Sequence, residues 1–171
     1  FTLIDEDAIV PFDDLIKTAD DKAWLKSFYP AFMENSQTGG KTWGIPFQRS
    51  TIVLYYNKEA FKEAGLDPNK APGTWSEMAD YAVKLTKRDA AGNVTQWGVQ
   101  IPSSGFPYWL FQGLALENGV NLMNAAGTEV YYDKPEVVGA LQYWLDLINK
   151  SKVHPPGIVE WGTTPKDFFE R

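Results

Sequence analysis

Residues 44–58 read GIPFQRSTIVLYYNK, and this segment is the most informative part of the chain. Its polar cluster of Gln48, Arg49 and Ser50 comes directly before β-branched and aromatic residues, which predict a β-strand over about 51–56. Two interpretations of the cluster stay open. It is either a solvent-exposed β-turn or a set of side chains that hydrogen-bond a polyol or a phosphate at a cleft.

Capping residues and hydrophobic periodicity predict the elements on both sides of this stretch. Before it we expect a short helix capped by Asp20 or Asp21 and ended by Pro30, and a turn over 36–42 that joins two strands. After it we expect a helix from the N-cap Asn57 through Ala64, closed by Gly65, and a second helix from the capping box Thr74–Glu77 to about Lys87. A strand over 95–101 and a helix over about 106–118 should follow. The rest of the chain predicts a hairpin-like stretch within 124–132, a helix from the capping box Asp133–Glu136, and a last helix that opens at Thr163.

This alternation of helices and strands favours an α/β fold with a layered sheet. Only about four candidate strands are present, which would leave the sheet edges open. We therefore expect the chain to be part of something larger. The helix that begins near Pro135 is expected to carry its apolar residues on one face: Val137, Val138, Leu141, Trp144, Leu145 and Ile148.

The composition fits a soluble protein of one domain or two small lobes. The 171 residues are 44% hydrophobic and 22% charged, and the formal net charge is −6. There is no stripe of Lys and Arg, so nucleic acid is not expected as a partner. There is no run of apolar residues long enough for a transmembrane segment. The absence of Cys excludes disulfides, and the seven Trp serve either core packing or contact with sugars.

The sequence predicts no catalytic residues, no metal site and no cofactor. His154, the single histidine, stands in a Lys-Val-His-Pro-Pro loop without a second His or any Cys, and we expect it at the surface. Most carboxylates lie at helix starts or on solvated faces, where the helix dipole explains them. No P-loop and no G-x-G-x-x-G motif is present.

A second candidate cluster lies between the expected strand at 95–101 and the helix that follows it. Residues 103–109 read SSGFPYW. In open α/β sheets, ligands bind beyond the carboxyl ends of strands, at such junctions. Phe106 and Trp109 are therefore either ligand platforms or core anchors of the helix.

Several motifs together resemble a known family. The chain carries, in order, WGIPF at 43–47, LYYNKEAF at 54–61, GLDP at 65–68, PGTWSEM at 72–78 and WGV at 97–99. This order resembles the extracellular solute-binding proteins of ABC importers, in the carbohydrate-type family with maltose-binding and glycerol-3-phosphate-binding members. The likeness spans roughly residues 20–171 and looks closest to the glycerol-3-phosphate branch.

The resemblance implies a type II periplasmic-binding-protein-like architecture of two α/β lobes, incomplete in this chain. Residues 1–54 would form the later part of lobe 1, ending in the crossover strand, and residues 55–171 the major part of lobe 2. Family members are about twice this length or more, so the resemblance implies that this chain carries only part of the cleft.

The same resemblance assigns ligand contacts by position within the motifs. Ser50 looks like a ligand-contacting residue of the crossover, with Gln48 and Arg49 as neighbours, and Phe106 and Trp109 look like the aromatic pair of lobe 2. Family members often have Trp or Tyr at position 106. Trp43 and Trp161 are expected in the core or at the rim of the cleft.

The leading hypothesis is a non-enzymatic receptor that closes around a sugar, polyol or glycerophospho-compound and delivers it to an ABC permease of the inner membrane. Such a protein would be periplasmic or extracellular, with a lipid anchor as an option in the full-length protein. The alternative is a carbohydrate-active enzyme or sugar-binding module, which would need two carboxylates about 5–9.5 Å apart at a cleft. A third possibility is a piece without activity of its own.

Overall fold

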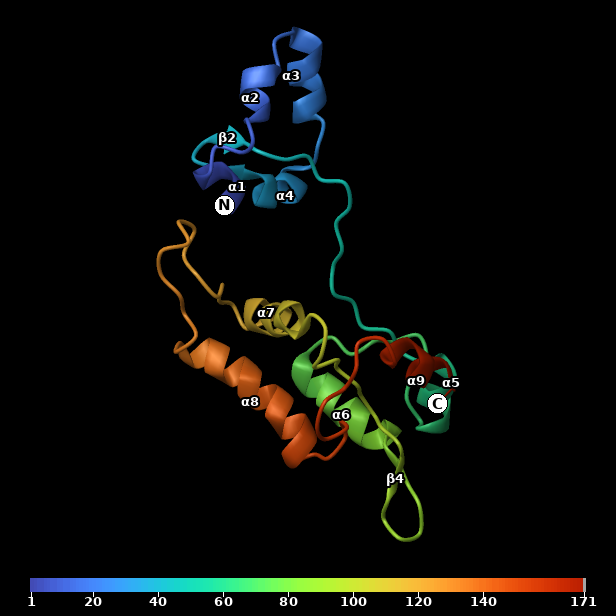
Figure 1. The fold of residues 1–171 in the computed structure, drawn as a ribbon. Coiled ribbons are helices and arrows are strands. Elements are labelled where there is room, and N and C mark those ends of the chain that lie inside the picture. The colour runs from blue at the N-terminus through green and yellow to red at the C-terminus, as the bar shows by residue number, and fades with distance from the viewer. Residues whose placement is uncertain (171) are drawn as a thin grey trace. The chain divides into compact units, whose positions relative to one another are not determined.

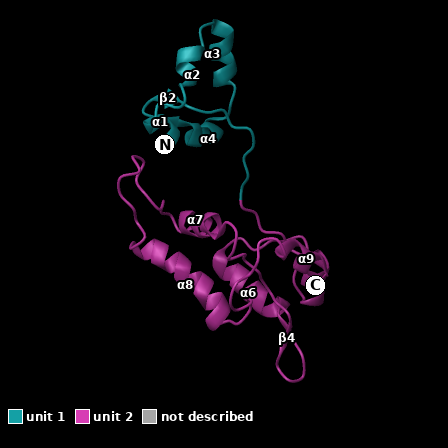
Figure 2. Ribbon diagram, viewed as in Figure 1, with its two compact units in different colours: residues 1–51 teal, residues 52–171 magenta. Residues whose placement is uncertain are grey.

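The computed structural model describes residues 1–170 and divides the chain into two compact units, residues 1–51 and residues 52–171 (Figures 1 and 2). The division falls after Thr51, slightly before the boundary after Leu54 that the resemblance implied.

Unit 1 consists of short helices and one small hairpin. Its elements are α1 (Thr2–Asp5), α2 (Phe12–Leu15), α3 (Ala19–Lys26), α4 (Pro30–Met33), the 3₁₀-helix η1 (Glu34–Ser36), β1 (Gln37–Thr38) and β2 (Lys41–Thr42). The antiparallel pairing of β1 with β2 confirms the predicted turn between two strands. The hairpin is held to α2, since the backbone N–H of Thr42 donates to the Asp13 carboxylate at 2.7 Å.

The N-cap of α3 is Thr18, and the expectation of Asp20 or Asp21 was wrong. The Thr18 hydroxyl accepts from the Asp21 N–H, and the Asp21 carboxylate accepts from the Thr18 N–H, both at 3.1 Å. Asp21 is thus the third helical residue of a reciprocal capping box.

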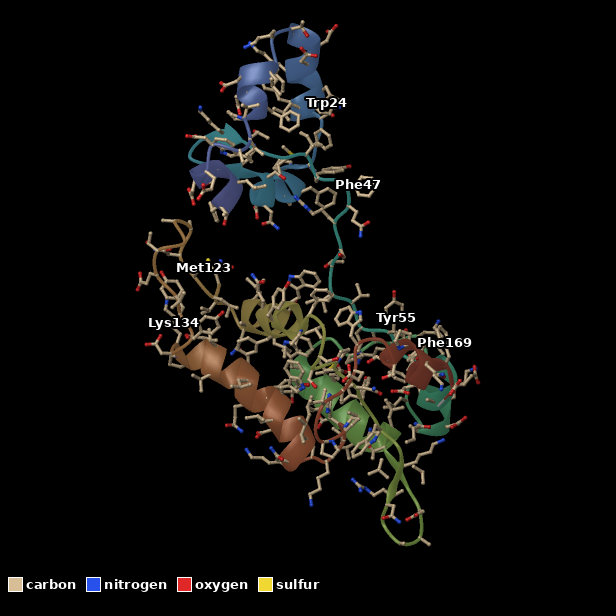
Figure 3. All side chains as sticks on the ribbon, viewed as in Figure 1. Trp24, Phe47, Tyr55, Met123, Lys134 and Phe169 are labelled. Carbon is tan, nitrogen blue, oxygen red and sulfur yellow. The ribbon has the colours of Figure 1, made fainter. Side chains whose placement is uncertain are left out.

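Residues 51–56 do not form the expected β-strand. A strand exists only where a neighbouring chain segment takes up its backbone hydrogen bonds, and no such neighbour pairs with this segment within residues 1–170. Its apolar side chains from Ile52 to Tyr55 are exposed instead. Figure 3 shows the labelled Tyr55 within this segment and Phe47 a few residues before it.

Unit 2 is built around three longer helices. Its elements are α5 (Lys58–Glu63), α6 (Trp75–Leu85), β3 (Lys87–Arg88), β4 (Val94–Gln96), α7 (Pro107–Glu117), α8 (Pro135–Asn149) and α9 (Thr164–Glu170). Asn57 caps α5 as predicted, accepting from the N–H groups of Glu59 and Ala60. An isolated bridge between Met123 and Val130 corresponds to the expected hairpin-like stretch.

Two hydrophobic clusters form the core of unit 2, and α8 contributes to both. One cluster joins α8 to α7, and the other joins α8 to α6 and to Val153. The core residues of α8 are Val137, Ala140, Trp144 and Leu147. The expected single apolar face was therefore only partly right, because Val138, Leu141 and Leu145 are exposed.

Three boundaries in unit 2 differ from the sequence-based expectations. The helix α6 ends at Leu85, because Lys87 begins the hairpin strand β3. The strand expected over 95–101 is assigned only as β4, Val94–Gln96. The N-cap of α8 is Lys134 without a side-chain hydrogen bond, so the capping box expected at Asp133 does not form, and Pro135 opens the helix instead.

The two hairpins are separate two-stranded sheets, and no single layered sheet forms within residues 1–170. Beyond β4 the chain makes backbone hydrogen bonds that are not part of a strand pairing. The N–H groups of Gly98 and Val99 both donate to the carbonyl oxygen of Val153, at 3.1 and 3.2 Å.

Candidate functional site

Four aromatic side chains gather at the N-terminus of α7, and we call them the aromatic cluster: Phe106, Tyr108, Trp109 and Trp161. Phe106 and Trp109 are stacked, with ring centroids 4.6 Å apart and planes 18° apart. Trp161 meets Phe106 edge-on at 6.1 Å, and Tyr108 meets Trp109 at 5.1 Å. All four remain exposed, so their rings form a surface and are not core anchors.

The local sequence explains why these rings meet. Phe106 is the N-cap of α7 and Pro107 occupies the first helical position, so Trp109 lies on the first turn close to Phe106. Gly105 has a φ of +71°, and a Cβ there would lie 3.1 Å from the Cβ of Trp161. A glycine at 105 thus permits both the turn and the close approach of Trp161.

Two serines tie the loop before α7 to the segment that carries Trp161. The Ser103 hydroxyl accepts from the Val159 N–H at 2.8 Å, and the Ser104 hydroxyl accepts from the Trp161 N–H at 3.1 Å. The same Ser104 hydroxyl donates to the Glu160 carboxylate at 2.6 Å. These contacts fix Trp161 beside Phe106, which the sequence did not predict, since the two residues are far apart in the chain.

The other predicted ligand residues lie in unit 1. The guanidinium of Arg49 is engaged within that unit, where it donates to the carbonyl oxygen of Phe32 at 2.8 and 3.0 Å and to the Ser36 hydroxyl at 3.2 Å. Gln48 and Ser50 are exposed on the irregular stretch that ends unit 1. The structure thus brings Phe106 and Trp109 together, while Gln48, Arg49 and Ser50 belong to the other unit.

The two further tryptophans have different environments. Trp43 is partly buried and its indole N–H donates to the Thr38 carbonyl oxygen at 3.1 Å, so it supports the hairpin of unit 1. Trp161 belongs to the aromatic cluster. The only local signal for Trp161 was its place shortly before a helix start, as for Phe106.

His154 is buried, contrary to the expectation of a surface residue. Its exposed fraction is 1%. Burial lowers the pKa of His154 below its usual value, and the hydrogen bonds with the Pro155 and Ile101 backbone act in the opposite direction. This burial could not be predicted, because nothing in the Lys-Val-His-Pro-Pro loop indicates that its backbone lies against residues 98–101.

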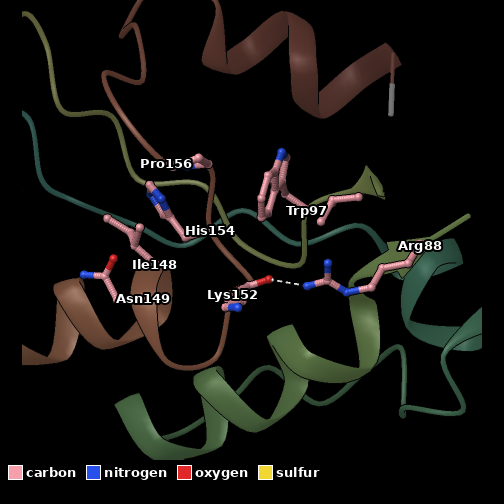
Figure 4. A pocket seen from close by; sticks show the side chains of 8 residues that line it. Arg88, Trp97, Ile148, Asn149, Lys152, His154 and Pro156 are labelled. Carbon is pink, nitrogen blue, oxygen red and sulfur yellow. Dashed lines mark hydrogen bonds between the residues drawn. The ribbon is translucent and has the colours of Figure 1, made fainter. Parts of the chain in front are cut away.

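A hollow of about 250 Å³ lies beside His154 (Figure 4). Its lining includes Trp97, Asn149, Arg88 and Lys152, and the Arg88 guanidinium donates to the Lys152 carbonyl oxygen at 2.8 Å. None of the residues predicted to bind ligand lines this hollow. Because it is separate from the aromatic cluster, we do not place the ligand there.

Neither a metal centre nor a membrane span is found in the part of the chain that the structure describes. Within residues 1–170, no three His, Cys, Asp or Glu side chains are placed to hold a metal ion. None of the helices in the same range has the length and apolar character needed to cross a bilayer.

Comparison with known proteins identifies sequence relatives. Residues 1–166 match the family described as bacterial extracellular solute-binding protein. The chain is 36% identical over 141 residues to the sn-glycerol-3-phosphate-binding periplasmic protein UgpB of Shigella dysenteriae and of Escherichia coli K12. The matched region covers 80% of this chain and 32% of each relative, so the chain spans about a third of their length.

Solved structures show the same likeness. The protein CpMnBP1 with mannotriose bound has a TM-score of 0.66 and 33% identity over 87% of this chain and 36% of that one. UgpB from Mycobacterium tuberculosis in complex with glycerophosphocholine has a TM-score of 0.70 over 90% of this chain and 37% of that one, and at 19% identity this likeness concerns the fold alone. The matches confirm the predicted fold class, an incomplete type II periplasmic-binding-protein-like architecture.

Proposed function

The chain belongs to the bacterial extracellular solute-binding proteins, and on that premise we propose that it is the substrate-binding component of an ABC importer. The protein would capture a sugar, polyol or glycerophospho-compound and deliver it to a permease in the inner membrane. It would act outside the cytoplasm without catalysing a reaction, either free in the periplasm or held by a lipid anchor.

The observation that carries this proposal is the exposed stack of Phe106 on Trp109. A sugar or glycerol derivative has an apolar C–H face and polar edges, and an aromatic platform covers such a face. The polar edges need hydrogen-bonding partners, since a buried group left without one costs about 1–3 kcal/mol. Ser50, Gln48 and Arg49 are proposed to supply some of them.

The two units correspond, in this proposal, to parts of the two lobes. Unit 1 would be the later part of lobe 1, and unit 2 the major part of lobe 2. The irregular stretch from Leu54 to Asn57 would serve as a hinge through which the lobes close over the ligand. Arg49 would have to release Phe32 and Ser36 in order to contact a ligand, so it is the weakest of the proposed contacts.

Ligand binding by the full-length protein tests the platform. We expect Trp109→Ala to weaken binding roughly tenfold, because losing about 60 Å² of covered apolar surface removes about 1.5 kcal/mol. Calorimetry with sn-glycerol 3-phosphate, glycerophosphocholine and mannotriose would measure the affinity. Each of these three probes is a ligand that is named for one of the similar proteins.

Trp24→Ala is the matched control. Trp24 has nearly the same exposed fraction as Trp109, 47% against 45%, and its ring meets that of Phe28 within unit 1, so it is not one of the proposed ligand contacts. Binding by this variant should equal that of the parent protein. A folded Trp109→Ala protein with unchanged affinity for every ligand that the parent protein binds would rule out the platform.

A further inference from the structure

Two segments of unit 2 run side by side toward the aromatic cluster, and we call their contact the seam: residues 98–106 and residues 153–161. At one end, the Gly98 and Val99 N–H groups share the carbonyl oxygen of Val153. Further along, the Ser103 and Ser104 N–H groups both donate to the carbonyl oxygen of Val159, at 2.8 and 3.2 Å. The seam ends where Trp161 meets Phe106.

His154 lies between these two sets of backbone contacts. Its Nε2 is 2.9 Å from the backbone nitrogen of Ile101, and its Nδ1 is 2.7 Å from the carbonyl oxygen of Pro155. An amide N–H can only donate, so Nε2 must be the unprotonated acceptor. The proton of the neutral ring therefore sits on Nδ1 and is donated to Pro155.

This arrangement needs the neutral form of the ring. In the imidazolium both ring nitrogens carry a proton, so Nε2–H would face the N–H of Ile101 and the bond between them would be lost. The nearby carbonyl oxygen of Ile101, 3.1 Å from Nε2, is the acceptor to which the charged ring would turn. Such a change alters the register of the seam at its middle.

The charged groups around His154 do not favour the imidazolium. The hollow beside the ring is lined by two cationic residues, Arg88 on β3 and Lys152 in the loop. The carboxylates on the adjoining elements are engaged elsewhere. Asp146 of α8 bonds to Lys150 and Gln142, and Asp167 of α9 accepts from Gln100.

We propose that His154 is a positioning residue of the aromatic cluster: its neutral ring fixes the register of the seam that places Trp161 against Phe106, and protonation of the ring releases that register. The effect on ligand affinity rests on the proposed function. The effect on the seam does not.

The pH range follows from the direction of the pKa shift. Burial lowers the pKa of His154 in the folded protein, so the unfolded chain binds this proton more readily. Stability therefore decreases as the pH falls below about 6.5, the ordinary value for histidine. The decrease ends once the pH is below the lowered pKa of the folded state.

The first experiment uses the full-length protein without ligand and compares it with His154→Gln and His154→Leu. The Gln side chain offers an amide oxygen to Ile101 and does not titrate, whereas Leu offers no acceptor. Hydrogen exchange of the peptide that contains Ile101 is measured at equal pH for all three proteins, from about pH 7.5 to about pH 5.5. Comparison at equal pH cancels the intrinsic pH dependence of exchange.

We expect the parent protein to match His154→Gln near pH 7.5 and to lose protection, about three- to tenfold, toward pH 5.5. His154→Leu should exchange faster at every pH. The proposal is overturned if the parent protein and His154→Gln show the same protection at every pH.

The second experiment measures binding of glycerophosphocholine and mannotriose by the same three proteins. Neither probe changes its charge over this pH range, so a pH dependence of affinity belongs to the protein. The parent protein should lose affinity toward acid pH and His154→Gln should not. Equal affinities in the two proteins at every pH would refute the link to the aromatic cluster. If neither probe binds to any of the proteins, the proposed function fails, and the exchange experiment still decides the role of His154.

Discussion

At the scale of single residues, Gly98 shows how closely the seam packs against α6. A Cβ at position 98 would collide with the carbonyl oxygen of Ala82 and lie 2.7 Å from the hydroxyl oxygen of Thr86. Both neighbours are fixed, since the Thr86 hydroxyl donates to Ala82 at 2.7 Å and accepts from the Gly98 N–H at 3.1 Å. The glycine is needed for space.

We expect Gly98→Ala to lower the free energy of unfolding by at least about 1–3 kcal/mol, because the added methyl group forces the seam away from α6. Urea denaturation would measure the change. Gly162→Ala is the matched control, since a Cβ there meets no atom within 4 Å. If the two variants were equally stable, the close approach at Gly98 would be disproved.

Two N-caps were predictable because their partners are near in sequence, although near partners did not prevent the errors at the N-termini of α3 and α8. Asn57 and Thr74 were recognised as N-caps because the N–H groups that they accept from lie two or three residues ahead. His154 and Trp161 were not, since their partners Ile101 and Phe106 are more than fifty positions away. A contact of that kind depends on the tertiary fold, about which the loop sequence carries no information.

At the scale of elements, helices were predicted better than strands. A helix satisfies its own backbone hydrogen bonds, whereas a strand needs a neighbour. The hairpin of β1 and β2 brings its own neighbour through a two-residue turn, and it was predicted. Residues 51–56 have strand-like composition and no pairing partner within residues 1–170, so composition alone was misleading. In α8, a buried face and an exposed apolar face were mistaken for one, because Leu141 lies four residues after the buried Val137 and three after the exposed Val138 and so has helical spacing to both.

The N-terminus of α6 offers a test of a single element. The Thr74 hydroxyl accepts from the Glu77 N–H at 3.1 Å, and the Glu77 carboxylate accepts from the Gly73 N–H at 2.8 Å. We expect Thr74→Ala to cost about 1 kcal/mol of stability, because the Glu77 N–H loses its acceptor. Thr74→Ser keeps the hydroxyl and should cost only a small part of that. Urea denaturation would compare them, and equal losses in both variants would show that the hydroxyl is unimportant.

At the scale of the whole molecule, the hydrophobic core is distributed unequally. Both hydrophobic clusters lie in unit 2. Among the buried hydrophobic side chains of the described residues 1–170, Met33 alone belongs to unit 1. The family resemblance implied a boundary near Leu54. It did not predict the uneven core, because that depends on long-range packing, which hydrophobic periodicity does not reveal. The two units should therefore differ in their resistance to unfolding.

Limited proteolysis of the 171-residue chain would test this inequality. Chymotrypsin cleaves after aromatic residues. Residues 43–57 contain no helix or strand, and in this segment Phe47 is 98% exposed and Tyr55 is 76% exposed. We expect the first cuts there, because proteases need exposed and locally unfolded backbone. The fragment from residue 48 or 56 onward should then persist and unfold cooperatively by circular dichroism, since it retains both hydrophobic clusters, while the unit 1 fragment is degraded. Replacing Phe47, the more exposed of the two, by Gln should slow cleavage at that residue without changing the thermal unfolding of the chain. Equal degradation rates of the two fragments would contradict an independently stable unit 2.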